Sequence, residues 1–155
     1  MTIAIGSDHA GVSLKQEITA YLKERGLDFT DMGPFGPESV DYPDYGERVA
    51  GLVAGGKAEK GILICGTGIG MSIVANKFAG IRAALCSEPL SARLSRQHND
   101  ANILVLGGRM IGPVMAREIV EIWLETPFEG GRHKLRLDKI FNIEGKKSKD
   151  AHQQA

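Results

Sequence analysis

Residues 61–86 read GILICGTGIGMSIVANKFAGIRAALC and contain one complete strand–helix–strand unit. The apolar run Gly61 to Cys65 predicts a strand, Met71 to Phe78 predicts a helix, and Ile81 to Cys86 predicts a second strand. An apolar run without alternation is typical of a parallel strand that is buried on both faces. The stretch therefore indicates an α/β protein with a parallel sheet.

The same alternation of strand and helix continues on both sides of this unit. Further strands are predicted at Thr2 to Gly6, Leu27 to Met32 and Asn102 to Leu106. Helices are predicted around Leu14–Leu22, Tyr45–Val53, Pro89–Gln97 and Met115–Trp123, with a last one from Arg132 to Gly145 at most. Apolar residues one turn apart give three of these helices a single buried face. The pattern predicts a doubly wound, five-stranded parallel sheet.

Length and composition favour one globular domain. We place that domain at residues 1–144 of the 155 and expect the polar tail 145–155 (GKKSKDAHQQA) to be disordered. Lys plus Arg equals Asp plus Glu at 19 each, so no global basic field favours nucleic acid. No apolar run is long enough for a membrane span, and the start lacks the pattern of a signal peptide. Two cysteines fit reduced thiols in a cytoplasmic protein.

Polar and glycine residues follow two of the predicted strands, where doubly wound folds place their ligand crevice. Asp8 and His9 follow the first strand, and Cys65 opens the loop Gly66 to Gly70 (GTGIG). The alternating glycines allow backbone N–H groups to approach an anion. A dinucleotide-binding site is the competing interpretation, and it fits poorly, because Met71 stands where the dinucleotide fingerprint needs its third glycine. A nest of this kind can instead hold an enediolate oxygen.

Cys65 borders this nest and has two open interpretations. Nearby donors and a helix N-terminus stabilise a thiolate, which can remove a proton next to a carbonyl. Alternatively, Cys65 is a small apolar residue at the end of a strand, since free cysteines are often buried and inert. Cys86 also ends a strand, and there we favour the inert reading.

Two histidines and three arginines are further candidates. His9 and His98 lie at chain turns, and histidine is suited to moving a proton near neutral pH. Arg132 and Arg136 are four apart on the last predicted helix, a spacing that suits a phosphate. Arg109 follows the last strand. For each of these residues taken alone, a solvated surface position is an equal or better reading.

Taken together, these residues resemble the ribose-5-phosphate isomerase B and galactose-6-phosphate isomerase family. The matching segments are SDHAG at 7–11, DYPDY at 41–45, the stretch 61–86 quoted above, SRQHNDANIL at 95–104 and EGGRHKLR at 129–136. The resemblance extends to about Glu144. It implies a Rossmann-like, three-layer α/β/α sandwich.

The resemblance also implies a reaction and a set of site residues. The reaction is the reversible isomerisation of ribose 5-phosphate and ribulose 5-phosphate, in the non-oxidative branch of the pentose phosphate pathway, without metal or organic cofactor. Cys65 would be the base and His98 would open the sugar ring. The substrate-binding residues implied are Asp8, His9, Gly66, Gly68, Ile69, Gly70, Asn99, Arg109, Arg132 and Arg136, with Thr67 beside the enediolate.

Within this family, one subtype uses a Cys base and the other a Glu at the position of Met71. Methionine cannot accept a proton, so the chain resembles the Cys subtype. The family's site is built across a homodimer, with His98, Asn99 and Arg109 expected from the neighbouring subunit, and pairs of dimers are common.

Three alternatives stay open. The substrate can be a six-carbon sugar phosphate, such as allose 6-phosphate or galactose 6-phosphate, because sequence does not measure the length of the site. The chain can also be a non-catalytic sugar-phosphate or nucleotide-binding module. A structural or interaction protein fits least, because polar residues gather at the strand ends.

Overall fold

The computed structural model describes the backbone of residues 1–153 and the side chains of residues 1–145. Its five strands are β1 (Thr2–Ser7), β2 (Asp28–Asp31), β3 (Lys60–Cys65), β4 (Ala83–Leu85) and β5 (Ile103–Gly107). The helices are α1 (Val12–Glu24), α2 (Tyr42–Ala54), α3 (Ile69–Ala75), α4 (Pro89–Asn99), α5 (Pro113–Glu125) and α6 (Arg132–Gln153). A short 3₁₀ turn, His9–Gly11, precedes α1. All five predicted strands are present, with ends that differ by one or two residues.

The strands form one parallel sheet in the order β2-β1-β3-β5-β4. The chain moves outward from β1 to β2 and then crosses to the other side of β1 to form β3. The strand order therefore reverses between β1 and β3, where Ser7 lies opposite Ile64. In doubly wound folds a crevice opens at this point, beyond the carboxyl ends of the strands.

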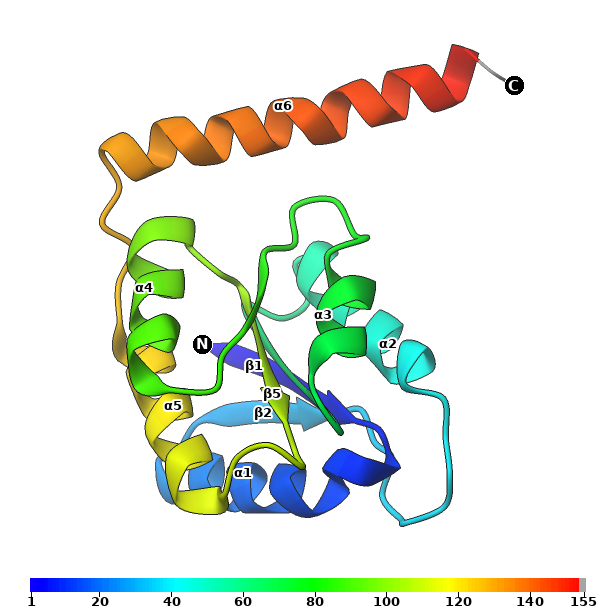
Figure 1. Cartoon of the computed structure of the whole chain (residues 1–155), viewed down its shortest axis with the longest axis vertical. Coiled ribbons are helices and arrows are strands. Elements are labelled where there is room, and N and C mark those ends of the chain that lie inside the picture. Colours follow the sequence, from blue (N-terminus) through cyan, green and yellow to red (C-terminus); the bar gives the residue numbers. More distant parts are fainter. Residues whose placement is uncertain (154–155) are drawn as a thin grey trace.

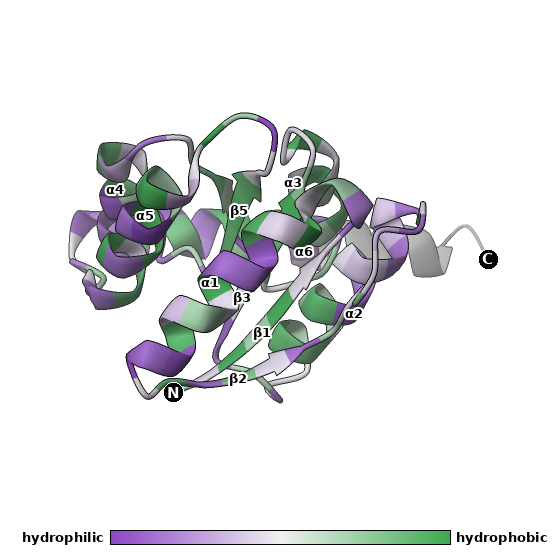
Figure 2. Ribbon diagram, turned by 90° about the horizontal axis from the view of Figure 1, so that it is seen from below, coloured by the Kyte–Doolittle hydropathy of each residue, from purple (hydrophilic) through white to green (hydrophobic). Residues whose placement is uncertain are grey.

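Helices cover both faces of the sheet (Figure 1). On one face, α1, α4 and α5 bury apolar side chains such as Ile18, Ala92 and Trp123. On the other face, α2 and α3 bury Val49 and Met71. In Figure 2 hydrophobic colour follows the central strands β3 and β5 between these helix layers, as expected for strands buried on both faces, whereas the edge strand β2 is mostly pale or hydrophilic. The expected three-layer sandwich is confirmed.

The segment between β2 and α2 is a long loop, as the prolines and glycines of residues 33–43 predict. The buried ammonium group of Lys15 anchors it, because Nζ pairs with the Asp31 carboxylate and donates to the Pro34 carbonyl over 2.9 Å. Lys15 is 2% exposed, so its charge needs these partners. Further along, the backbone N–H of Val40 lies 3.2 Å from Nδ1 of His9. The loop is thus tied to the start of α1.

The last helix is longer than the sequence predicts. α6 passes through Gly145 and continues to Gln153, whereas we expected it to end by Gly145. One glycine costs a helix only about 1 kcal/mol, and the lysines, alanine and glutamine that follow favour helix. α6 lies outside the three layers and extends past them (Figure 1). The division into a domain of residues 1–144 and a tail stays a prediction. Among the described residues, no helix is both long and apolar enough to cross a membrane.

Candidate active site

The first group of predicted site residues meets at the carboxyl ends of β1, β3 and β5. Backbone hydrogen bonds join the three chain segments that leave these strands. The N–H of Asp8 donates to the carbonyl of Ile64 over 3.0 Å, and the N–H of Arg109 donates to the carbonyl of Gly66, also over 3.0 Å. Asp8, Cys65 and Arg109 are therefore held on neighbouring segments at the point where the strand order reverses.

The thiol of Cys65 faces the glycine loop. Its Sγ accepts a hydrogen bond from the N–H of Gly68 over 3.1 Å, and the residue is 4% exposed. Gly68 has a φ of 81°, in the left-handed region. A Cβ at this position would lie 2.4 Å from Cδ1 of Leu85. Only glycine fits here, and its backbone turn aims the N–H at the sulfur. The hydrogen bond holds the sulfur against the loop.

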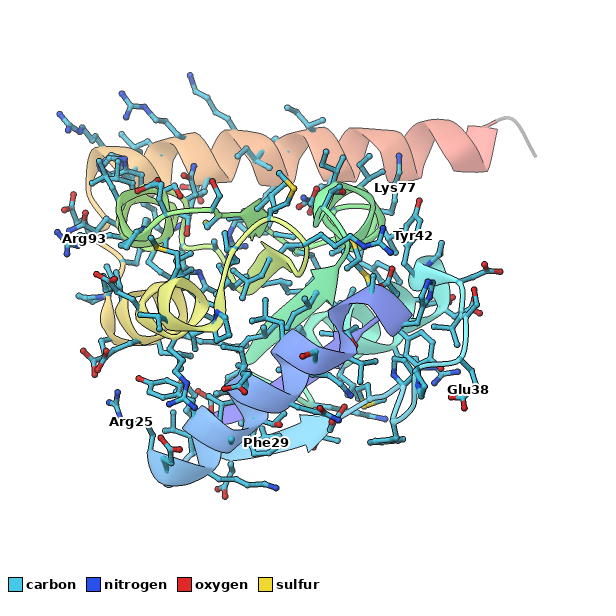
Figure 3. All side chains as sticks on the ribbon, turned by 60° about the horizontal axis from the view of Figure 1, so that its bottom comes forward. Arg25, Phe29, Glu38, Tyr42, Lys77 and Arg93 are labelled. Atoms are coloured by element: carbon cyan, nitrogen blue, oxygen red, sulfur yellow. The ribbon has the colours of Figure 1, made fainter. Side chains whose placement is uncertain are left out.

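The rest of the loop contains backbone N–H groups and packs against the ring of Tyr42. The Ile69 N–H donates to Oγ1 of Thr67 over 3.3 Å. The first-turn N–H groups of a helix have no acceptors within it, so the start of α3 offers donors to a ligand oxygen. The ring of Tyr42 lies against Gly70, because a Cβ there would be 2.6 Å from Cζ of the tyrosine. Figure 3 labels Tyr42 at the start of α2.

Sequence reasoning did not select Tyr42, although it stands in the DYPDY segment at 41–45. Tyr42 is 39% exposed, so part of the residue faces solvent beside the glycine loop. Met71, which follows the loop, is fully buried between α2 and the sheet. It therefore serves the core and offers no proton acceptor in the Cys65 loop.

Asp8 and His9 lie on the turn that follows β1. The Asp8 carboxylate accepts from the N–H of Gly11 over 3.0 Å and is largely buried, so it caps the 3₁₀ turn. Nδ1 of His9 lies 3.2 Å from the N–H and 3.3 Å from the carbonyl of Val40. The loop of residues 33–43 therefore fixes the orientation of the His9 ring.

The second cysteine has a different setting. Cys86 is 2% exposed and packs in the core beside Ala92. Burial, opposed by hydrogen bonds with Ser91 and Ser95, raises the pKa of the Cys86 thiol. Cys86 therefore favours its neutral form, in agreement with the inert reading.

The second group of predicted residues lies at the opposite end of the strands, near the amino end of β5. His98 and Asn99 end α4, which runs back from the carboxyl end of β4 to the amino end of β5. Arg82, just before β4, donates from Nε to the Asn99 carbonyl over 2.9 Å. β5 has five residues. At about 3.3 Å of rise per residue, roughly 16 Å of sheet separates this group from Cys65.

The start of α6 joins this second group. The rings of His98 and His133 stack with centroids 4.3 Å apart and planes 10° apart. Arg132 and Arg136 flank His133 on α6 and are exposed. Nitrogen-tipped side chains project from the first half of α6, away from the sheet (Figure 3). Both arginines therefore lie on the same helix as His133, which stacks on His98. This second group lies far from Cys65 of the same chain.

Arg109 lies beside the glycine loop of its own chain. A Cβ on Gly66 would be 3.6 Å from the Arg109 Cδ and Nη1 atoms. The reason is the insertion of β5 next to β3, which places residues 107–109 beside the Cys65 loop. The expectation that Arg109, with His98 and Asn99, serves the site of a neighbouring subunit stays a prediction.

Comparison with known proteins shows the family to which the chain is similar. Residues 3–140 match the family model described as Ribose/Galactose Isomerase. The chain is 55% identical to "Ribose-5-phosphate isomerase B" of Escherichia coli over 146 residues, which cover 94% of this chain and 98% of that protein. Among solved structures, ribose-5-phosphate isomerase B of Clostridium thermocellum has a TM-score of 0.93 and 55% identity, covering 94% of this chain and 99% of that one. The Mycoplasma genitalium enzyme with bound ribulose-5-phosphate has a TM-score of 0.89 and 42% identity, covering 93% and 96%.

The fold and the thiol-bearing glycine loop define a class of doubly wound α/β proteins with a glycine-rich loop at the strand reversal. Within that class, the chain belongs to the ribose/galactose isomerase family.

Proposed function

We propose that the chain is a ribose-5-phosphate isomerase of the B type, an aldose–ketose isomerase that interconverts ribose 5-phosphate and ribulose 5-phosphate. One observation carries the proposal: the Cys65 thiol accepts a hydrogen bond from the backbone N–H of Gly68, in the glycine loop that follows the strand. Family membership and the ribose-5-phosphate isomerase B relatives support it.

The chemistry follows from the position of the thiolate. Cys65 removes the proton from C2 of the open-chain aldose, and the electron pair moves to the carbonyl oxygen on C1. The resulting cis-enediolate carries negative charge, which the N–H groups of residues 66–70 stabilise. Thr67 lies beside these donors. Cys65 then returns the proton to C1, while the proton on the C2 oxygen is lost and the C1 oxygen gains one.

Ring opening and phosphate binding belong to the second group of residues. His98 moves the proton between the ring oxygen and the C1 hydroxyl, which opens the furanose. Asn99 binds the sugar hydroxyls. Arg132 and Arg136 hold the phosphate with charged hydrogen bonds. Arg109 lies beside the glycine loop of its own chain, and Asp8 and His9 contact the sugar from the first strand.

A homodimer would bring the two groups together. Each chain carries the Cys65 group at the carboxyl ends of its strands and the histidine–arginine group near their amino ends. Two copies related by a twofold axis can therefore form two shared sites. The apolar side chains of Leu135, Ile140, Phe141 and Ile143 on α6 are 43–66% exposed, which favours a partner surface. Pairing of dimers and a cytoplasmic location, where phosphorylated sugars are metabolised, are parts of the same proposal.

The experiment is a turnover assay on a panel of five- and six-carbon aldose phosphates. We expect ribose 5-phosphate to be converted with the highest kcat/KM. Higher kcat/KM on allose 6-phosphate or galactose 6-phosphate would assign the six-carbon alternative. Binding of these sugars without any turnover would overturn the isomerase and leave a binding module.

A further inference from the structure

Three potential metal ligands, one of which is His98, lie together at the end of α4. Ligand atoms of His98, Glu129 and His133 all lie within 4.8 Å of one another. The N–H of Glu129 donates to the carbonyl of Gln97 over 3.1 Å, which holds the segment between α5 and α6 against the end of α4. The His133 N–H donates to the Gly130 carbonyl over 3.0 Å. The backbone therefore fixes all three residues at one place.

His133 is the buried member of this group and has an unpartnered atom. The residue is 6% exposed, and among the described residues its Nε2 has no hydrogen-bond partner. The nearest acceptor is Oε2 of Glu129 at 3.5 Å, beyond a good hydrogen bond. A buried polar atom without a partner is costly and rare in folded proteins. The unpartnered Nε2 atom of His133 is therefore available to bind a ligand.

The chemistry of the group selects the kind of ligand. Two imidazoles and one carboxylate are a known ligand set for Zn²⁺ with an open fourth position. Zn²⁺ bonds of about 2.0–2.1 Å place neighbouring ligand atoms roughly 3.4 Å apart, so atoms that lie up to 4.8 Å apart must approach by up to about 1.4 Å. The His98 ring, whose plane is within 10° of the His133 ring, must also turn out of this stack, because a metal lies in the plane of each imidazole that binds it. Glu129 is exposed and His98 is partly exposed, which leaves both side chains free to adjust.

The charged side chains around the group favour weak, reversible metal binding over a permanently bound metal ion. The guanidinium groups of Arg132 and Arg136 repel a cation, while the Glu129 carboxylate attracts it. We therefore expect weaker binding than at a structural zinc site.

We propose that His98, Glu129 and His133 form an inhibitory site for a divalent transition metal, with Zn²⁺ as the best fit. The inhibition rests on the proposed function, because a metal on the His98 imidazole blocks the lone pair that ring opening needs. The metal is not part of the isomerisation itself. Binding, in contrast, can be tested without any activity.

The binding test uses the full chain after chelator treatment. Zn²⁺ binding is measured by calorimetry, and Co²⁺ is used as a spectroscopic probe of imidazole ligation. We expect one site per chain, with affinity at least tenfold lower in Glu129→Gln and in His133→Gln. Glu118→Gln, which changes an exposed carboxylate on α5, is the matched control and should bind normally. Glu129 is also exposed, so its variant keeps the test valid if His133→Gln fails to fold.

Thiols are the competing ligands, so the titration is repeated with Cys65→Ser and Cys86→Ser. Metal binding that disappears in either variant, and is unchanged in Glu129→Gln, would overturn the proposal. Binding that persists in both and weakens in Glu129→Gln supports it. If the chain binds Zn²⁺ in this way but converts no sugar, the metal site stands and the isomerase proposal falls.

The activity test follows ribose 5-phosphate turnover against Zn²⁺ concentration, with reversal by a chelator. Glu129→Gln should keep the basal turnover and need at least tenfold more Zn²⁺ for half inhibition. A four-carbon aldose phosphate that cannot close a furanose ring should be inhibited much less than ribose 5-phosphate. Equal inhibition of both substrates would place the inhibitory metal elsewhere and overturn the proposal.

Discussion

The backbone N–H of Gly68 donates a hydrogen bond to Sγ of Cys65 across 3.1 Å, inside a turn that only glycine can adopt. This contact holds the sulfur of the proposed base against the glycine loop. Both cysteines are buried, but Cys65 accepts this backbone hydrogen bond, whereas burial raises the pKa of the Cys86 thiol.

Replacing Cys65 by Ser should lower kcat for ribose 5-phosphate by about 10²–10⁴-fold, because a hydroxyl is a far weaker base at neutral pH. Steady-state kinetics on the purified variant measure this change, and circular dichroism checks the fold. Cys86→Ser is the matched control and should keep kcat within a few-fold. Near-normal turnover of Cys65→Ser would remove the thiol from the mechanism.

Replacing His98 by Asn should slow the conversion of ribose 5-phosphate by about 10²-fold, because the ring-opening proton shuttle is lost. The same variant should convert a four-carbon aldose phosphate, which cannot form a furanose, at nearly the normal rate. The ratio of the two kcat/KM values is the measurement. If both substrates lose the same factor, His98 does not act in ring opening.

Replacing Arg136 by Ala should raise KM for ribose 5-phosphate by about 10–100-fold, since a charged hydrogen bond to phosphate contributes about 1.5–3 kcal/mol. Lys139→Ala, an exposed basic residue one turn further along α6, is the control and should leave KM unchanged. An unchanged KM in Arg136→Ala would mean that this face of α6 is only solvated.

Mixing inactive Cys65→Ala with inactive His98→Asn should restore activity if the site is shared between subunits. Half of the randomly formed dimers contain one copy of each variant, and each such dimer has one intact site. The mixture, after exchange of subunits, should therefore reach about a quarter of wild-type activity. Turnover that stays at the level of the separate variants would place each site within one chain.

Lys60 makes stability depend on pH. Burial, with a smaller contribution from the charge of Arg96, lowers its pKa from 10.5 to about 8. Between these values the unfolded chain binds a proton that the folded chain lacks, so stability rises with pH and the effect is complete above 10.5. Because Lys60 is only partly buried, solvent screening reduces the effect, and we expect the free energy of unfolding to rise by about 1–2 kcal/mol over this pH range.

The measurement is urea unfolding at pH 7.5 and 9.5 of the wild type and Lys60→Met. Relative to the variant, the wild type should gain stability at the higher pH. The variant removes the ammonium group that donates to the Leu124 carbonyl and lies over the Trp123 ring, so its absolute stability also changes. The difference between the two pH slopes isolates the titration, and parallel slopes would contradict the pKa shift.

Much of the first group of site residues could be predicted because it is local in the sequence. Cys65 and the five residues that follow are contiguous, and glycine spacing after an apolar strand has a direct conformational meaning. The end of α6 could not be predicted in the same way, because one glycine among good helix formers is a weak stop.

The sequence by itself determined the alternation of strands and helices, the parallel sheet and the thiol–glycine loop, since these depend on periodicity and on neighbouring residues. Only the tertiary structure decided that β5 lies beside β3 and brings Arg109 to Gly66. It also decided that Tyr42 covers Gly70 and that His98 stacks on His133, 35 residues later in the chain. Such contacts join distant segments, and their geometry is set by how whole elements pack, which local sequence does not encode.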